Sequence, residues 1–493
     1  MVANNQQIDR LFKIEEELDK FYESRDKISI KKLIRELRTM EPKLDGLYQI
    51  MAQYHIATSY LDLHTIHIQS KSEDIVSDGS CDKFDDAVKI NKYFSKAIKC
   101  IERYSPEGED IELFNEIQCR LYINYANYLD DMGRGLLAIE YYHKALEMGK
   151  KVEEACINLS IAYDRYSEWD YDEGHKYFIK LFAAKYAQES RNHKPLEISS
   201  REERRLIEME IEKFSSPIIK IDDAEEKEYR HWCMRNKLLL NTLNDLPIDN
   251  LYYATDPLRI PNITTSFDSI PVIYAMYNQI KMEYIFSRYQ LYLYYNKPDC
   301  GLITKDVCLI DSRDKVQYTI KQEQLKTSYK SLYGLLDKIT ILLNEYFCFG
   351  TDPHKIYFCK LDEMVTQKGF SNKPEYHDNG PLKTIVDISR DYKNEMDTNR
   401  DPKLLHDLKI KQLRDRLEHR FVLVYDETVD LSENSDGSVL HVSNEELETL
   451  TTYLLKLVRE LLIYTTEAIY IHERNKTTGT NTIKRTLKEI EQE

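Results

Sequence analysis

Apolar side chains recur at helical spacing along most of this chain, and few turn-forming residues interrupt them. Only 14 glycines and 13 prolines occur among 493 residues, which favours long elements over tight turns. The pattern begins near the amino terminus, where apolar residues follow helical spacing at Ile8, Leu11, Phe12, Ile14, Leu18 and Phe21. We therefore predict an all-α fold.

The charge and the cysteine content restrict the class of protein. A net charge of −16 argues against a general nucleic-acid coat, which would be basic, but it leaves room for a local basic cleft. The apolar runs are too short to cross a bilayer, so we expect no membrane partner. Nine scattered cysteines without a Cys-x-x-Cys pair, and no recognisable signal peptide, favour a cytoplasmic protein.

The amino-terminal part shows a period of about 34 residues, as in tetratricopeptide repeats, where small residues let two antiparallel helices touch. Four residues have the corresponding small-small-large-small spacing: Ala126, Ala138, Tyr142 and Ala145. One period after Leu129 comes Tyr163, inside the next predicted first helix. Residues 1–190 are therefore predicted to form a helical solenoid. Such a solenoid either has no ligand or binds a protein or peptide on its concave face.

The carboxy-terminal half has the pattern of a helical bundle. Its apolar periodicity predicts helices at about 269–295, 322–347, 382–396, 403–425 and 444–474. Between them, residues 302–318 alternate enough for a short hairpin. Residues 350–379 form an irregular insertion, and residues 426–440 form an acidic loop.

Two Ser-x-x-Glu sequences are typical of capping boxes at helix starts. They are Ser200 with Glu203 and Ser443 with Glu446. The first lies in a charged segment that separates the repeats from the bundle. We expect repeats at 1–190, a connector at 191–265, a bundle at 266–475 and a flexible polar tail at 476–493.

The predicted helix at 403–425 carries Arg414 and His419. A guanidinium can hold a phosphate by two parallel hydrogen bonds, and an imidazole can move a proton near neutral pH. Basic side chains gather around this pair in an otherwise acidic chain, at Lys409, Lys411, Arg416 and Arg420. The structural alternative is a solvated charged face, with an ion pair from Arg414 to Glu418.

A second arginine-to-histidine spacing lies upstream, from Arg400 to His406. Pro402 would begin a helix there, so Arg400 lies before that helix and His406 lies inside it. The geometry of this pair therefore varies with the loop. Arg414 and His419 both lie in the helix interior, which favours them as the functional pair.

The sequence Arg414-Asp415-Arg416-Leu417-Glu418-His419 resembles the Arg-x-x-x-x-His signature of HEPN-domain ribonucleases. Residues 229–245 and 256–261 resemble the connector of a bacterial family that joins tetratricopeptide-like repeats to a carboxy-terminal HEPN domain. The resemblance covers residues 229–475. It implies a homodimer that cuts RNA with arginine and histidine from two protomers, without a metal or another cofactor.

The resemblance also implies roles for single residues. The ribose 2′-hydroxyl would attack the adjacent phosphate and leave a 2′,3′-cyclic phosphate, while Arg414 binds the non-bridging oxygens. His419 would serve as acid, as base or as a phosphate-orienting group. Two acidic residues across the bundle could pair with Arg414, or could instead form core salt bridges. The full supporting set is Asp415, Glu418, Arg420, Asp337 and Glu283, with Lys411 and Arg416 as RNA-binding residues.

Three readings of the function stay open. The first is a ribonuclease that acts as a regulated toxin or anti-phage effector, with tRNA as a candidate substrate and the repeats as sensor or restraint. The second is a regulator without catalysis, in which the repeats bind a partner and the bundle only dimerises. The third is a peptide-sensing regulator dominated by its repeats, and the lack of a recognisable DNA-binding domain disfavours a transcriptional version of it. The intact signature favours the first reading over the second.

Overall fold

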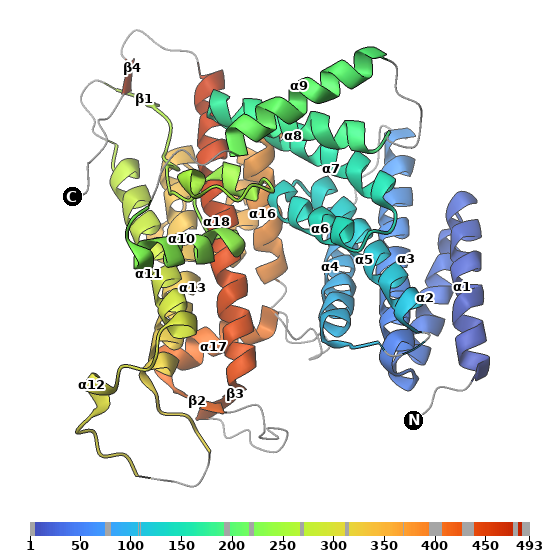
Figure 1. Cartoon of the computed structure of the whole chain (residues 1–493), viewed down its shortest axis with the longest axis horizontal. Helices are drawn as coiled ribbons and strands as arrows, with labels where there is room; N and C mark the ends of the chain where they lie inside the picture. Colours follow the sequence, from blue (N-terminus) through green and yellow to red (C-terminus); the bar gives the residue numbers. More distant parts are fainter. Residues whose placement is uncertain are drawn as a thin grey trace. The chain divides into compact units, whose positions relative to one another are not determined.

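The computed structural model describes residues 5–73, 80–106, 108, 110–191, 198–215, 221–266, 271–310, 315–367, 369–393, 407–425, 438–476 and 482–485. Two compact units divide the chain. The first comprises Met1–Tyr166 and Lys180–Glu208, and the second comprises Ser167–Ile179 and Met209–Glu493. Regular structure is almost entirely helical (Figure 1). The all-α prediction is therefore confirmed for the described residues.

The first unit is a succession of helices. They are α1 (Asn5–Glu23), α2 (Lys27–Met40), η1 (Glu41–Lys43), α3 (Gly46–Glu73), α4 (Ser80–Arg103), α5 (Asp110–Asp131), α6 (Gly135–Glu147), nearly all of α7 (Val152–Ser167), and parts of α8 (Glu173–Glu189) and α9 (Ile198–Ser215). The four residues with repeat spacing, in α5 and α6, are all buried, as close helix contact requires. The assignment of these helices to tetratricopeptide repeats stays a prediction.

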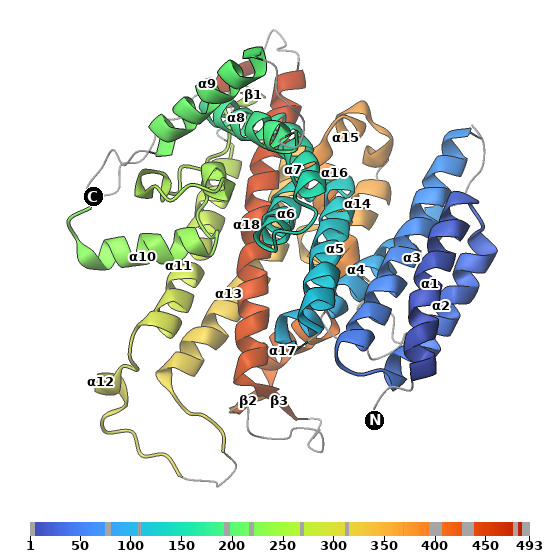
Figure 2. The same cartoon turned by 45° about the vertical axis from the view of Figure 1, so that its right-hand side comes forward.

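The second unit contains the remaining parts of α8 and α9, then short elements, and then a bundle. Its elements are α10 (Ala224–Arg235), η2 (Thr242–Asp245), η3 (Leu251–Tyr253), β1 (Ile263–Ser266), α11 (Ile273–Asn296), α12 (Gly301–Thr304), α13 (Ile320–Phe347), η4 (Pro353–Lys355), η5 (Phe358–Lys360), α14 (Leu361–Gln367), η6 (Phe370–Asn372), α15 (Pro374–His377), α16 (Gly380–Lys393), α17 (Asp407–His419), β2 (Phe421–Tyr425), β3 (Val439–Ser443), α18 (Asn444–Asn475) and β4 (Thr482–Arg485). Helices α11, α13 and α18 lie side by side (Figures 1 and 2). Because α18 is buried on nearly all sides along its middle, it is the central helix of this unit.

The two predicted capping boxes have different outcomes. The Ser443 hydroxyl accepts a hydrogen bond from the Glu446 backbone N–H (3.1 Å) where α18 begins, so this cap is confirmed. Helix α9 already begins at Ile198. The predicted start at Ser200 is therefore wrong, because the two residues before it continue the helical backbone.

The predicted motif helix is too long at its carboxyl end. Helix α17 ends at His419, and Phe421–Tyr425 forms β2, which pairs in parallel with β3. The residues Phe-Val-Leu-Val-Tyr favour a strand, because aromatic and β-branched side chains pack well on a pleated surface. The expected loop at 426–440 ends earlier than predicted, because β3 begins at Val439. Residues 426–437 lie outside the described residues.

The predicted hairpin at 302–318 is wrong. The structure has the short helix α12 there, and Val316 forms an isolated bridge with Tyr425 of β2 instead. Val316 pairs with the edge of β2 that β3 leaves open. The alternation of apolar and polar residues at 302–318 cannot reveal such a pairing, because the partner strand lies far along the chain. Within the predicted tail at 476–493, residues 482–485 form β4, which pairs antiparallel with β1. Residues 477–481 and 486–493 lie outside the described residues.

The insertion at 350–379 is more ordered than predicted. It contains η4, η5, α14, η6 and α15. Apolar side chains anchor these short helices, with Ile356, Phe358, Leu361, Met364 and Phe370 all buried. Burial of such side chains stabilises each short helix, although none of these helices is long enough to be stable alone.

Two buried arginines fix the 238–258 segment on the bundle. Arg459 of α18 donates to the Leu239 carbonyl (2.7 Å) and to both carboxylate oxygens of Asp245 (3.0 and 2.8 Å). From α11, Arg288 donates to the Leu238 carbonyl (3.0 Å) and to both oxygens of Asp256 (2.8 and 2.7 Å). Two helices therefore hold two consecutive carbonyl groups of one segment.

Replacing Arg459 with methionine leaves Asp245 buried without its cation, so we expect a loss of about 3–5 kcal/mol of unfolding free energy. Denaturant unfolding followed by circular dichroism measures this loss. The matched control is Lys213→Met, which removes an exposed ion pair with Glu210 (2.7 Å) and should leave the unfolding free energy almost unchanged. Equal losses for the two variants would contradict the proposed importance of the buried pair.

Candidate functional site

Helix α17 is anchored on α13 by its apolar side. Ile410 and Leu413 are buried. The Tyr329 hydroxyl of α13 donates a buried hydrogen bond to the Ile410 carbonyl (2.7 Å). This contact lies one helical turn before Arg414, so it sets where the Arg414 side chain can reach.

Arg414 faces two residues of α13 and one of its own helix. Its guanidinium lies over the Tyr333 ring, 5.5 Å from the centroid. Its Nη1 donates to Asp415 Oδ1 at 2.9 Å. Asp337 follows Tyr333 by one turn, on the same face of α13, and its carboxylate attracts the guanidinium. The Arg414 side chain is nevertheless 36% exposed, so a phosphate can reach it.

The surroundings of Arg414 keep it charged. Burial alone would lower its pKa, but the hydrogen bond to Asp415 and the attraction of Asp415, Tyr333 and Asp337 raise the pKa overall. Burial raises the pKa of Asp337, and the Phe358 N–H and Arg414 only partly oppose this effect. Asp337 therefore takes up a proton at a higher pH than a solvated aspartate does.

His419 is the last residue of α17 and is exposed. Five residues along an ideal helix turn a side chain by about 140°, so His419 and Arg414 leave α17 in different directions. No hydrogen bond or ion pair joins His419 to the described residues. Within one chain, the described residues therefore show no hydrogen bond or ion pair between Arg414 and His419.

The other predicted residues have different surroundings. Glu283 accepts two hydrogen bonds from Lys338 (both 2.6 Å) and so forms an ion pair between α11 and α13. Glu418 and Arg420 are exposed at the end of α17, and Arg416 is partly buried. The Lys411 side chain and the alternative pair Arg400 and His406 lie outside the described residues.

Sequence reasoning missed Tyr333. Its signal was its spacing, four residues before Asp337, which places both side chains on one face of a helix. This signal was hidden because the chain has 37 tyrosines, and most of them have the spacing of side chains that pack between helices.

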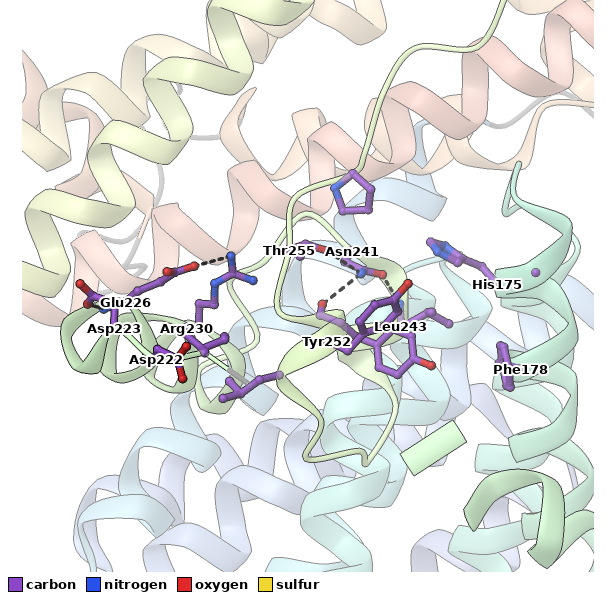
Figure 3. A pocket seen from close by; sticks show the side chains of 15 residues that line it. His175, Phe178, Asp222, Asp223, Glu226, Arg230, Asn241, Leu243, Tyr252 and Thr255 are labelled. Atoms are coloured by element: carbon purple, nitrogen blue, oxygen red, sulfur yellow. Dashed lines mark hydrogen bonds and ion pairs between the residues drawn. The ribbon is translucent and has the colours of Figure 1, made fainter. Parts of the chain in front are cut away.

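A cavity of about 880 Å³ lies in the second unit, lined in part by His175 and Phe178 of α8 (Figure 3). On the opposite side it is lined by acidic residues before and within α10, namely Asp222, Asp223 and Glu226, and by Arg230. Arg230 is paired with Glu226 at 2.6 Å. Three carboxylates against one paired arginine repel a polyanion. We therefore place the candidate site for RNA at Arg414 and not in this cavity.

Residues 264–472 match the LA2681-like HEPN family. This HEPN domain begins in β1, ends in the last turns of α18, and includes both α13 and α17. The resemblance found in the sequence is therefore confirmed for these residues. No curated protein and no solved structure matches the chain.

The comparison does not extend to the amino-terminal repeats, whose assignment and boundaries stay predictions. Across the described ranges, no helix combines the length and the apolar character needed to cross a membrane.

Asp337 also holds the insertion, because Oδ1 accepts a hydrogen bond from the Phe358 backbone N–H (2.8 Å). We expect Asp337→Ala to speed hydrogen exchange at the Phe358 amide by about tenfold or more, since a hydrogen bond to a charged group contributes about 1.5–3 kcal/mol. Mass spectrometry of the peptides covering 352–360 measures the rate.

The matched control is Asp352→Ala, which removes the exposed acceptor of the His354 N–H (3.0 Å). It should leave the Phe358 rate unchanged. Unaltered exchange at Phe358 in Asp337→Ala would show that Asp337 does not hold η5.

Proposed function

We propose that the HEPN domain is a metal-independent endoribonuclease that uses Arg414 and His419. The observation that carries this proposal is the Arg414 guanidinium, which is kept charged and oriented by α13 while its side chain is 36% exposed. A fixed and accessible guanidinium suits the oxygens of a phosphate that gains charge during reaction. The family match supports an HEPN-type function for this domain.

The reaction transfers a phosphoryl group within the RNA. The 2′-oxygen forms a bond to the adjacent phosphorus as the bond to the 5′-oxygen breaks, which gives a 2′,3′-cyclic phosphate and a free 5′-hydroxyl. One proton leaves the 2′-hydroxyl, and one reaches the departing 5′-oxygen. His419 can carry out either transfer, and Arg414 stabilises the non-bridging oxygens.

A homodimer follows from the directions of the two side chains. Because Arg414 and His419 leave α17 about 140° apart, one chain does not place them on one phosphate. A twofold axis beside α17 brings Arg414 of one copy next to His419 of the partner subunit. RNA then binds across the two copies, with Arg416 and Lys411 as further phosphate contacts.

The first unit supplies regulation in this proposal. Its helix pairs form a tetratricopeptide-like surface at residues 1–190 that binds a protein or peptide and restrains or triggers cleavage. Residues 191–265 connect this surface to the nuclease. A restrained nuclease of this kind suits a toxin or an anti-phage effector in the cytoplasm, with tRNA as a candidate substrate.

The second candidate is a regulator that dimerises without cutting RNA. The Arg414–Asp415 hydrogen bond (2.9 Å) favours it, because the guanidinium already has an anionic partner without RNA. Cleavage assays separate the two functions.

In EDTA, the purified chain should cut total cellular RNA, and Arg414→Ala and His419→Ala should each slow cleavage by about 100-fold or more. Sequencing the cut ends and testing them for cyclic phosphate measures the activity. Two matched controls should stay within about twofold of the parent. They are Arg474→Ala, which removes an exposed arginine stacked over Tyr470 (5.8 Å), and the exposed-histidine change His377→Ala. Cleavage that survives in both site variants would refute the assignment.

Co-expression of Arg414→Ala with His419→Ala tests the shared site. Half of the dimers formed from an equal mixture contain one copy of each variant, and one of their two sites is then intact, so about a quarter of the parent activity should return. Each chain carries a different affinity tag, so that mixed dimers can be purified and assayed. If mixed dimers form but stay inactive, the two residues do not act across the subunits.

A further inference from the structure

An exposed aromatic residue lies at the start of η5. Tyr357 is 48% exposed, and the Lys360 Nζ lies 5.4 Å from the centre of its ring. His354 and Lys355, just before it, are exposed as well. The nearby Asp362 carboxylate is already paired with Arg390 at 2.6 Å. Tyr357 therefore presents an open ring beside positive charge.

The backbone holds Tyr357 in this outward position. Its φ of −138° and ψ of 145° are those of an extended strand, in which successive side chains point to opposite sides. The neighbours on both sides, Ile356 and Phe358, are 4% and 3% exposed. Because these two side chains are fixed in the core, the ring between them is directed to solvent.

The same backbone ties Tyr357 to the surroundings of Arg414. The next residue, Phe358, donates its N–H to Asp337 Oδ1 at 2.8 Å. Standard backbone dimensions then place the Tyr357 Cα within about 6 Å of that carboxylate oxygen. Asp337 lies one helical turn after Tyr333, and the Arg414 guanidinium lies over the Tyr333 ring, 5.5 Å from its centroid. The backbone of Tyr357 and the Arg414 guanidinium are therefore both held next to the same part of α13.

We propose that Tyr357 and Lys360 form a platform on which a base of single-stranded RNA stacks, next to the phosphate that Arg414 holds. This inference rests on the proposed ribonuclease function. Stacking on a tyrosine ring needs an unpaired base, and the lysine adds attraction to the phosphate chain. The substrate is then a loop or a single-stranded segment, bound with little base preference because every base has an aromatic face.

Binding is tested with a fluorescent single-stranded oligonucleotide that carries a 2′-O-methyl group on every ribose. This probe lacks the attacking hydroxyl, so the full chain binds it without cutting. Tyr357→Ala should weaken binding by about 5- to 150-fold, and Tyr357→Phe, which keeps the ring, should stay within about threefold. Lys360→Met should reduce the slope of log affinity against log salt by about 0.7, the value for one phosphate contact.

A second oligonucleotide with abasic sites at all positions separates stacking from charge. On this probe Tyr357→Ala should have no effect, whereas Lys360→Met should still weaken binding. The control variant is Tyr252→Ala, which removes another exposed tyrosine in a 3-10 helix. It should bind both probes as the parent does.

The outcomes separate this inference from the proposed function. If Arg414→Ala weakens binding but Tyr357→Ala behaves like Tyr252→Ala, the platform is refuted and the nuclease proposal stands. If Tyr357→Ala weakens binding but Arg414→Ala neither weakens it nor stops cleavage, the platform stands and the site assignment fails. If the parent chain does not bind the probe, the platform is refuted.

Discussion

Two buried arginines reach consecutive carbonyl groups, at Leu238 and Leu239, from two different helices of the bundle. Each arginine also forms a two-point pair with an aspartate of the same segment. Removing a guanidinium from water is costly unless its donors are satisfied, and here carbonyls and carboxylates satisfy most of them. A segment with little regular structure is thereby held at a fixed place on α11 and α18. Both of these helices pack against α13, which carries Tyr333 and Asp337 beside Arg414.

The sequence could predict the features that depend on local spacing. Periodic apolar residues located α11, α13 and α18, and the Ser443 cap located the start of α18. Pairings between distant residues could not be read from spacing. Nothing in the sequence near Arg288, for example, indicates Asp256 as its partner. The end of α17 was missed for the same reason, because β2 forms by pairing with β3 and not by propensity alone.

In the candidate site, too, the features set by local spacing were predictable and the contacts between distant residues were not. Arg414 and His419 stand out from their residue types and spacing, and the sequence also named Asp337 as one of two acidic residues across the bundle. The choice between Asp337 and Glu283 required the structure, since Lys338 holds Glu283. The spacing of Tyr333 before Asp337 did not single it out among 37 tyrosines, and nothing in the local sequence distinguishes the exposed Tyr357 from a packed tyrosine. What distinguishes them is the neighbour that the fold provides.

The short parallel pair β2–β3 determines how His419 is supported. His419 is separated by one residue from β2, and β3 runs into α18 without a break, because Ser443 is both the last strand residue and the cap of that helix. The backbone that follows His419 is thus tied through β2 and β3 to the start of α18, although the His419 side chain itself faces solvent. If His419 acts as proposed, its backbone is already ordered before a substrate binds, which lowers the entropy cost of binding. The order of this backbone comes from strand pairing, which compensates for the fraying common at a helix end.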